Sequence, residues 1–120
     1  MKIKKDDTIR VVAGKDKGKD GKVLSTISKK QKVVIEGVNI RTRHIKKTSQ
    51  QAGQIVKYPA PIHVSNVMIL DPKDSKPTKI GYSIGKDRKK LRISKRSGEV
   101  LDSKSAKAKT AKKAAPKKTK

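Results

Sequence analysis

Apolar residues recur at every second position in several short runs of this chain. The clearest same-face pairs are Ile9 and Val11, Val23 and Ile27, and Val33 and Ile35. Because successive side chains of a β-strand point to opposite faces of its sheet, this alternation is typical of strands. No segment before residue 100 shows a helical period. The pattern predicts an all-β protein.

Short polar segments separate the strand-like runs. They are residues 13–22, residues 28–30 and the pair Glu36-Gly37. The first of them contains only Ala, Gly, Lys and Asp. A longer stretch, from Ile62 to Leu70, has apolar residues on both of its faces. Several short strands with brief turns favour a small barrel, because a barrel closes on itself and leaves no open edge.

Residues 46–61 interrupt the alternation. This segment is polar and ends in two prolines, Pro59 and Pro61. A long excursion between strand-like flanks is uncommon in a compact domain unless it has a function or is disordered. We expect an extended, protruding loop with its tip near residues 51–53 and a base stiffened by the prolines. The lysines expected at this base are Lys46, Lys47 and Lys57.

The pattern changes again after residue 70. Residues 71–77 are rich in Pro, Asp and Lys, and two further short strands are predicted at residues 79–84 and 90–94. From Asp102 onward the chain carries 8 Lys and one Asp, with Ala as its only apolar residue type. Such a composition cannot bury enough surface to offset the entropy cost of ordering. The predicted divisions are a barrel with its protruding loop at 1–70, a C-terminal β extension at 71–101 and a disordered basic tail at 102–120.

The charge of the chain indicates a polyanionic partner. Its 34 basic and 10 acidic residues give a formal net charge of +24 in 120 residues. Solubility alone requires a net charge of only about 2–8 for a small domain. Nucleic acid is the most common polyanion, and neutralising its phosphates releases counterions and drives binding. A membrane partner is not expected, since no basic amphipathic helix is predicted.

Missing residue types narrow the function further. The chain has no Cys, which excludes disulfides, zinc knuckles and thiol catalysis. Without a secretion signal or an apolar run of membrane-spanning length, we expect a cytoplasmic protein. The aromatic residues are Tyr58 and Tyr82, with no Phe or Trp. Because single-strand binders stack bases on several aromatic rings, this chain is expected to read phosphates and shape on folded or double-stranded nucleic acid.

The polar residues contain no recognisable catalytic or cofactor site. His44 and His63 have no Cys or carboxylate cluster beside them, so no metal site is predicted. Asp6-Asp7 precedes the first strand without a base partner and fits a turn better than acid–base chemistry. Glycine-rich nucleotide-binding patterns are absent at the required spacing. We expect no enzyme activity, no cofactor and no small-molecule substrate.

The loop at residues 13–22 has the chemistry of a phosphate-binding turn. Its glycines permit backbone angles that are closed to other residues and leave room for the backbone of a partner. Its lysines lie between the glycines, so amide donors and positive charge are presented together. The glycines are Gly14, Gly18 and Gly21, and the lysines are Lys15, Lys17, Lys19 and Lys22.

A second basic segment follows at residues 39–47, where apolar and basic residues alternate. If this segment is a strand, Arg41 and Arg43 project from one face. Arg binds phosphate with two parallel hydrogen bonds and also stacks on exposed bases. His44, in the same run, is expected to donate a hydrogen bond to RNA. A solvated polar face is the alternative interpretation of this segment.

The glycine loop and its flanking strands resemble the KOW motif, which occurs in ribosomal proteins and transcription elongation factors. The similarity spans residues 8–39 and includes Glu36-Gly37-Val38-Asn39 at the spacing of the family. Residues 65–101, with the turn Ser97-Gly98-Glu99, are similar to the C-terminal extension of the bacterial family of large-subunit ribosomal protein twenty-four. The resemblance stops before the tail.

This resemblance implies both a fold and a function. The fold would be an SH3-like barrel with a protruding hairpin and a short β-rich extension. The function would be that of a structural constituent of the large ribosomal subunit, bound to 23S-type ribosomal RNA and to neighbouring ribosomal proteins. The resemblance also implies an early role in subunit assembly on the 5′ part of that RNA. The hairpin would lie beside the exit of the nascent-chain tunnel, near the nascent chain or exit-site factors.

From the residues and the resemblance together we predict two sets of interface residues. The RNA-binding residues are Lys4, Lys5, Arg10, Gly14, Lys15, Lys17, Gly18, Lys19, Gly21, Lys22, Asn39, Arg41, Arg43, His44, Lys46, Lys47 and Asn66. The tip of the hairpin carries no formal charge, so we expect it to extend past RNA without binding it. The tip residues are Gln50, Gln51, Ala52, Gly53 and Gln54.

Two other functions are compatible with the sequence. Residues 107–120 resemble the tails of linker histones, which would suit an architectural DNA-binding protein, although the chain lacks an apolar wedge or a recognition helix. A protein-binding KOW module of the transcription machinery would normally belong to a longer chain and would not need this charge. Recovery of the partners of this chain from a nuclease-treated lysate separates the three functions. Loss of ribosomal partners supports binding to ribosomal RNA. Partners that depend on DNA support the architectural DNA-binding protein, and recovery of polymerase supports the transcription module.

Overall fold

The computed structural model describes residues 1–102 of the chain. These residues contain ten β-strands and two 3-10 turns, η1 (Ser28–Lys30) and η2 (Val64–Asn66), which confirms the predicted all-β class. They form two compact units, one from Met1 to Leu70 and one that begins at Asp71. The predicted disordered tail lies outside the described residues, apart from Asp102. No helix within residues 1–102 is long and apolar enough to cross a membrane.

The first unit is built around an antiparallel sheet that curls into a small barrel. Its strands are β1 (Thr8–Val11), β2 (Asp20–Ile27), β3 (Lys32–Ile35), β6 (Ile62–His63) and β7 (Val67–Leu70), in the order β6-β3-β2-β1-β7. β6 and β7 lie at opposite ends of this order, yet only η2 joins them. A 3-10 turn of this length spans roughly 8 Å, whereas the outer strands of a flat five-stranded sheet lie about 19 Å apart. The short connection therefore requires the sheet to curl.

The concave face of this sheet encloses an apolar core. The buried apolar side chains are Ile3, Ile9, Val11, Val23, Val33, Ile35, Val38, Ala60, Val67 and Ile69. The alternation predicted for β1 and β3 is thereby confirmed. In β2 the register shifts between Val23 and Ser25, and Ile27 beyond this irregularity is only half-buried.

The stretch from Ile62 to Leu70 is not one continuous strand. η2 separates β6 from β7, and the backbone N–H of Val12 donates a hydrogen bond of 2.9 Å to the carbonyl oxygen of Asn66. Alternation resumes only in β7, where Val67 and Ile69 face the core. The apolar pattern placed residues on both faces of one stretch, and it missed the turn that divides this stretch into two strands.

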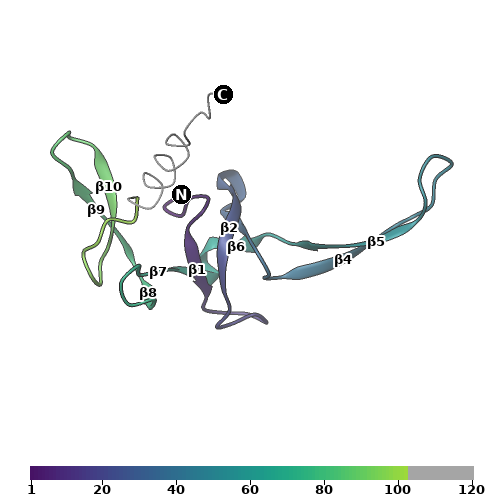
Figure 1. Ribbon diagram of the computed structural model, residues 1–120, viewed down its shortest axis with the longest axis horizontal. Helices are drawn as coiled ribbons and strands as arrows, with labels where there is room; N and C mark the ends of the chain where they lie inside the picture. Colours follow the sequence, from purple (N-terminus) through teal and green to yellow (C-terminus); the bar gives the residue numbers. More distant parts are fainter. Residues whose placement is uncertain (103–120) are drawn as a thin grey trace, which may run out of the picture. The chain divides into compact units, whose positions relative to one another are not determined.

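A separate hairpin extends away from the barrel strands (Figure 1). It consists of β4 (Ile40–Ile45) and β5 (Gln54–Pro59), which pair only with each other. Ile40 lies opposite Pro59 at its base. The protruding element is longer than the predicted loop at 46–61, because the alternating residues before Lys46 form its first strand.

The far end of this hairpin closes as a tight turn. Thr48 and Gln51 exchange two backbone hydrogen bonds, of 2.9 and 3.2 Å. Lys46 and Lys47 lie beside this turn, so their predicted position at the base is wrong; the error arose because the first strand was not counted as part of the hairpin. Lys57 does lie in the stem, opposite Thr42.

The second unit contains β8 (Pro77–Thr78) and a hairpin formed by β9 (Ile80–Ile84) and β10 (Lys90–Ser94). These two longer strands confirm the strands predicted at 79–84 and 90–94. They are antiparallel, with Ile84 opposite Lys90 at the turn and Ile80 opposite Ser94 at the other end.

Polar side chains hold this second unit together. The buried Asp71 carboxylate accepts hydrogen bonds from the hydroxyls of Ser94, at 2.7 Å, and Ser97, at 2.9 Å. The buried Arg92 side chain binds Asp102 Oδ1 through Nε and Nη2, both at 2.9 Å. Asp102, which the sequence places in the tail, therefore belongs to the ordered unit because this ion pair joins it to β10.

Candidate nucleic-acid interface

The loop between β1 and β2 is the centre of the predicted RNA interface. Gly14 has a φ of +105° and Gly18 a φ of +87°, and apart from their chain neighbours no described residue lies within 4 Å of the position that a Cβ would occupy. The backbone N–H of Gly18 donates a hydrogen bond of 2.7 Å to the carbonyl oxygen of Val11. Backbone conformation, and not crowding, therefore requires glycine at these two positions.

Gly21 has a different role from the one predicted. It lies in β2 and does not have a positive φ. A Cβ at this position would lie 2.5 Å from Ile35 Cγ2 and 2.7 Å from the carbonyl oxygen of Glu36. Gly21 is thus needed where β2 packs closely against β3, and its assignment to turn geometry is wrong.

The cations of the loop and of the strands that flank it differ in their partners. Three of them form ion pairs: Arg10 Nη2 with Asp20 Oδ2 at 2.7 Å, Lys19 Nζ with Asp16 Oδ1 at 2.7 Å, and Lys22 Nζ with Asp6 Oδ1 at 3.3 Å. Lys15 and Lys17 are exposed and form no ion pair with any residue of the described chain. These two lysines can therefore meet a polyanion without first breaking an internal pair.

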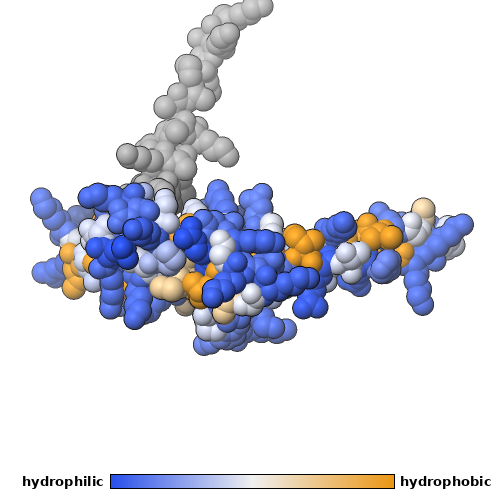
Figure 2. All heavy atoms as spheres, turned by 90° about the horizontal axis from the view of Figure 1, so that it is seen from below, coloured by the Kyte–Doolittle hydropathy of each residue, from blue (hydrophilic) through white to orange (hydrophobic). Residues whose placement is uncertain are grey.

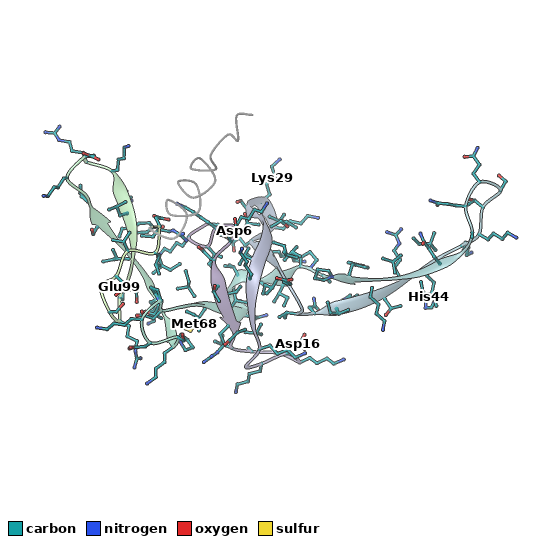
Figure 3. The ribbon with its side chains drawn as sticks, viewed as in Figure 1. Asp6, Asp16, Lys29, His44, Met68 and Glu99 are labelled. Carbon is teal, nitrogen blue, oxygen red and sulfur yellow. The ribbon has the colours of Figure 1, made fainter. Side chains whose placement is uncertain are left out.

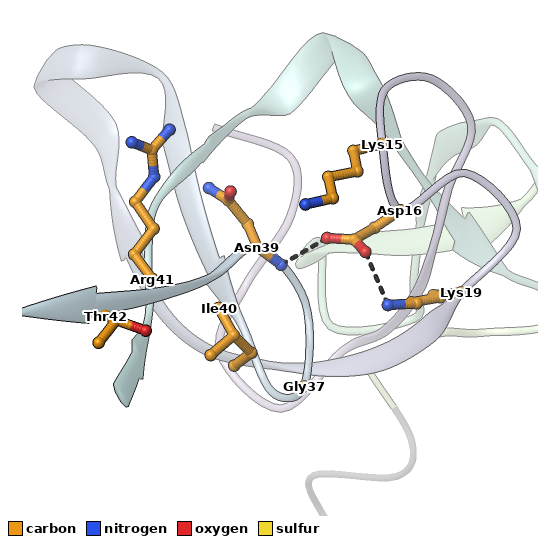
Figure 4. A pocket seen from close by; sticks show the side chains of 8 residues that line it. All are labelled: Lys15, Asp16, Lys19, Gly37, Asn39, Ile40, Arg41 and Thr42. Atoms are coloured by element: carbon orange, nitrogen blue, oxygen red, sulfur yellow. Dashed lines mark hydrogen bonds and ion pairs between the residues drawn. The ribbon is translucent and has the colours of Figure 1, made fainter. Parts of the chain in front are cut away.

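Asp16 joins the glycine loop to the base of the β4–β5 hairpin (Figure 4). One of its carboxylate oxygens accepts a hydrogen bond of 2.7 Å from the Asn39 backbone N–H, and the other accepts one of 2.7 Å from Lys19 Nζ. The bond from Lys19, followed by the bond from Asn39, lowers the pKa of Asp16. Asp16 is not among the residues predicted from the sequence. The sequence gives one sign of its role, because it is an acidic residue among the lysines of the loop.

Asn39 continues this connection to the return strand of the hairpin. Its side-chain Nδ2 donates to the carbonyl oxygen of Ala60 at 3.3 Å, and its own carbonyl oxygen accepts from the Ala60 N–H at 3.0 Å. Its φ of +52° is one that Asn adopts more readily than most residues. The positions of the loop and of Arg41 are therefore linked through Asp16 and Asn39.

The hairpin stem presents basic and apolar side chains together. Its register places Arg41 and Arg43 on one face, as predicted, and His44 on the other, opposite Ile55. Figure 3 shows His44 well out along the stem, away from the barrel. Ile55 is 64% exposed, and Figure 2 shows hydrophobic patches along the hairpin amid a largely hydrophilic surface. The stem therefore exposes two arginines on one face and two isoleucines, Ile40 and Ile55, on the other.

The structure does not bring all the predicted RNA-binding residues together. Those near the glycine loop are Gly14, Lys15, Lys17, Gly18, Lys19, Asn39, Arg41 and, through its bond to Val12, Asn66. Lys4 and Lys5 precede β1, toward the other end of the barrel, and Lys22 lies opposite Thr8 at that end. Figure 3 marks the two ends of β1 by Asp6 and Asp16. Lys46 and Lys47 lie near the hairpin tip.

The predicted tip residues divide between the turn and the return strand. Gln50 and Gln51 belong to the turn, and Gln54 is the first residue of β5, opposite Ile45. Ala52 and Gly53 connect the two. All five are exposed, so this uncharged segment is accessible to a partner.

Comparison with known proteins decides the family. Residues 5–36 match the KOW motif, and residues 38–101 match the family described as "Large ribosomal subunit protein uL24, C-terminal domain". The protein of that name from Staphylococcus aureus (strain JH9) is 54% identical over 104 residues, 86% of this chain and 98% of its own. Its counterpart from Chelativorans sp. (strain BNC1) is 50% identical over 102 residues, 85% of this chain and 98% of its own. The chain belongs to the uL24 family.

Membership of the uL24 family confirms the predicted class, that of a ribosomal, non-enzymatic KOW-motif protein of the cytoplasm. The KOW match ends at residue 36 and the uL24 match begins at residue 38. The hydrogen bond from Asn39 to Asp16 therefore connects the two matched segments.

This uL24-family chain also carries a basic turn that sequence reasoning left out. Lys86, Arg88, Lys89 and Lys90 are exposed at the end of the β9–β10 hairpin. Lys90 Nζ lies 4.8 Å from the centre of the Tyr82 ring. These basic residues are visible in the sequence, but they lie outside the glycine loop and the basic segment 39–47 from which most of the RNA-binding residues were predicted.

Proposed function

We propose that this uL24-family chain is a structural constituent of the large ribosomal subunit that binds 23S-type ribosomal RNA. The surface it uses is the glycine loop and the base of the β4–β5 hairpin. The observation that carries the proposal is that Lys15 and Lys17 form no ion pair within residues 1–102 and lie on a loop shaped by Gly14 and Gly18. A surface of this kind presents exposed cations to phosphate oxygens at one place.

Binding is driven by electrostatics and located by the barrel. Lys15, Lys17 and Arg41 neutralise phosphates, and the release of counterions supplies free energy. Asp16 and Asn39 hold the loop beside the hairpin base, so the distances between these cations are restricted. Where RNA helices converge, a fixed set of cations favours one packing of those helices over others. This is the physical basis for the early assembly role on the 5′ part of the RNA that the resemblance implies.

The hairpin tip has a separate role in this proposal. Residues 50–54 carry no charge and lie at the end of the hairpin, where the neighbouring cations are Lys46 and Lys47. In this proposal those two lysines mark the limit of phosphate binding, and residues 50–54 project past the RNA. The resemblance implies a position beside the tunnel exit, where the tip would meet the nascent chain or exit-site factors. The neighbouring ribosomal proteins are the remaining partners.

Two substitutions in the glycine loop test RNA binding. Gly18→Val should lower the affinity for a 5′ fragment of large-subunit RNA more than Lys17→Ala does. Valine cannot readily adopt the φ of +87°, so the whole loop must shift, whereas Lys17→Ala removes a single phosphate contact. Filter binding measures both affinities.

Gly98→Val is the matched control for this experiment. Gly98 has a φ of +74° and the same open surroundings, but it lies in the second unit, outside the proposed surface. It should therefore leave the RNA affinity unchanged. Equal losses for Gly18→Val and Lys17→Ala, with the fold intact, would show that the backbone shape of the loop has no part in binding.

A cross-linker at Gln51 tests the role of the tip. In translating ribosomes it should capture nascent peptide or an exit-site factor, and removal of residues 50–54 should leave incorporation into the large subunit intact. A cross-linker at Lys29 in η1, on the barrel, is the control and should not capture nascent peptide. Capture of RNA alone at Gln51, or failure of the shortened protein to assemble, would contradict the proposed role.

A further inference from the structure

One face of the β4–β5 hairpin brings two arginines and an aromatic ring together. Residues directly opposite each other in an antiparallel pair share a face of the sheet. The register pairs Arg41 with Tyr58 at the base of the stem and, further out, Arg43 with Val56. These four side chains are all exposed, and we call their surface the Arg–Tyr face.

The opposite face of the same ribbon has a different composition. Its side chains are those of Ile40, Thr42, His44, Ile55, Lys57 and Pro59. Figure 4 shows the Arg41 side chain on one side of β4 and those of Ile40 and Thr42 on the other. A ligand held by the two arginines therefore contacts Tyr58 and does not reach this second face.

The side chains of the Arg–Tyr face have no partner among residues 1–102 that would occupy them. Arg41 and Arg43 form no ion pair there, and the Tyr58 side chain makes no hydrogen bond or ring contact. Residues 40–59 contain no Asp or Glu, so no acid of the hairpin itself can neutralise the arginines. Two free guanidinium groups beside an open ring match a nucleotide, which has charged phosphates and a flat base.

The Arg–Tyr face also continues the surface proposed for RNA. Arg41 lines the same cavity as Lys15 and Lys19 of the glycine loop. Arg43 lies two residues further along β4, about 7 Å away at the usual rise of a strand. This separation is of the same order as that between consecutive phosphates of RNA. A strand of RNA that binds the glycine loop can thus extend along the stem.

We propose that the Arg–Tyr face binds one unpaired nucleotide of the RNA. Its base stacks on the Tyr58 ring beside Val56. The phosphates on either side of it are bound by Arg41 and Arg43. In folded RNA, unpaired bases of loops and bulges splay out and stack on aromatic side chains. The two tyrosines of this chain cannot build a platform for several bases, but one ring is enough to hold a single base.

This inference rests on the proposed RNA-binding function and extends it. Phosphate contacts alone position a protein on RNA without carrying sequence information. A base that must leave its helix to reach Tyr58 adds a requirement for an unpaired nucleotide at one place. The stem would then distinguish a looped or bulged RNA from a continuous duplex.

Substitution of the ring tests the stacking contact. Tyr58→Ile should weaken binding to the 5′ fragment of large-subunit RNA about tenfold, since stacking of one base contributes about five- to 150-fold in affinity. Isoleucine is apolar and suits a strand, so the hairpin is preserved. Tyr58→Phe keeps the ring and should bind as the unaltered protein does. Equal losses for the two variants would overturn the proposal, because the ring would then not be the group that binds.

The salt dependence separates stacking from phosphate binding. Tyr58→Ile should leave the slope of log affinity against log salt unchanged, whereas Arg43→Gln should reduce it by about 0.7–0.9. Ile55→Ala is the control for the opposite face, where Ile55 is 64% exposed, and should leave the affinity unchanged. A loss in Ile55→Ala equal to that in Tyr58→Ile would overturn the assignment of the nucleotide to one face.

Fluorescence gives a direct readout of the stacked base. The chain has no Trp, so Tyr58→Trp introduces a single indole ring. This ring can still stack, and its emission should be quenched when the RNA fragment is added. Tyr82→Trp is the matched control, because Tyr82 is 43% exposed but lies in the second unit. Absence of quenching in Tyr58→Trp, or equal quenching in both variants, would contradict the proposal.

Abasic substitution in the RNA identifies the bound nucleotide. Each unpaired nucleotide of the fragment is replaced in turn by an abasic site. One position should weaken binding of the unaltered protein about tenfold and have no further effect on Tyr58→Ile. If no position behaves in this way while the unaltered protein binds the fragment, the stacking site is refuted and RNA binding stands. If the unaltered protein does not bind the fragment, both proposals fall.

Discussion

The barrel unit and the C-terminal unit bury different kinds of side chain. Every buried apolar residue that the structure describes lies between Ile3 and Ile69, in the barrel. The buried polar and charged residues of residues 1–102 all lie in the other unit: Asp71, Thr78, Arg92 and Ser94. One chain therefore contains an apolar core and, after Leu70, a small polar one.

The difference predicts different responses to mutation and to pH. Apolar burial is roughly proportional to area and does not depend on protonation. A buried polar network depends on each partner, because a donor or acceptor left without one carries the full cost of its desolvation. All buried side-chain polar atoms in the described chain have a hydrogen-bond partner. The C-terminal unit should thus be sensitive to single polar substitutions that the barrel would tolerate.

The largest effect is expected in the barrel core. Ile9 is fully buried, with 0% exposure. Its replacement by Ala should reduce the free energy of unfolding by about 2–5 kcal/mol, because the missing side-chain atoms leave a cavity. Urea denaturation measures this change. Ile84→Ala in the C-terminal unit is the matched control, because Ile84 is 78% exposed and should change stability by no more than about 0.5 kcal/mol. Similar losses for the two variants would contradict the contrast between the units.

A smaller and more local effect is expected at Asp102. Asp102→Ala leaves the Arg92 guanidinium buried without its ion pair and should cost the C-terminal unit about 1–3 kcal/mol. Amide hydrogen exchange should accelerate at Leu101, whose N–H bonds to the Arg92 carbonyl oxygen at 2.8 Å, and not in the barrel.

Asp74→Ala is the control for this prediction. Asp74 lies 3.6 Å from Arg96, but both side chains are about half exposed, at 44% and 50%. Such pairs contribute only about 0–1 kcal/mol. Unchanged exchange at Leu101 in Asp102→Ala would show that the buried ion pair does not stabilise this unit.

The smallest effect concerns pH. The hydroxyl of Ser94, together with other donors, lowers the pKa of Asp71 from 3.8 to about 2. Because the unfolded carboxyl binds protons more tightly than the folded one, this stabilisation is present above about pH 4 and is lost as the pH falls toward 2. The protection factor of the Ser94 amide, which corrects for the slower intrinsic exchange in acid, should therefore fall over this range.

The barrel provides the internal comparison for the pH experiment. Asp16 and Asp20 also have lowered pKa values, but they hold the loop and the surface of β1 and β2 and do not line the apolar core. Core amides of β3, such as that of Ile35, should keep their protection at pH 3. In Asp71→Asn the acid-dependent step at Ser94 should disappear. If Asp71→Asn showed an acid-dependent step of the same size, the step would belong to a titratable group other than Asp71.

Much of the fold followed from local patterns in the sequence. Alternation in β1 and β3 identified strands because a strand face repeats at every second residue, and β9 and β10 were predicted as short strands after the break at residues 71–77. The hairpin was only partly predicted. Alternation of apolar and basic residues indicates its first strand, residues 40–45, whereas residues 54–59 of its return strand lack such alternation and fall within the predicted loop.

The excess of positive charge, the need for glycine at Gly14 and Gly18 and the lack of charge at residues 50–54 follow from the amino-acid sequence alone. These are properties of single residues and their neighbours. The folded chain, in contrast, sets which cations are paired, brings Gly21 against Ile35 and joins Asp16 to Asn39. The last contact joins residues 23 positions apart. Such a contact depends on the register of β1, β2 and β3 and on where their connecting loops end. No local pattern specifies these.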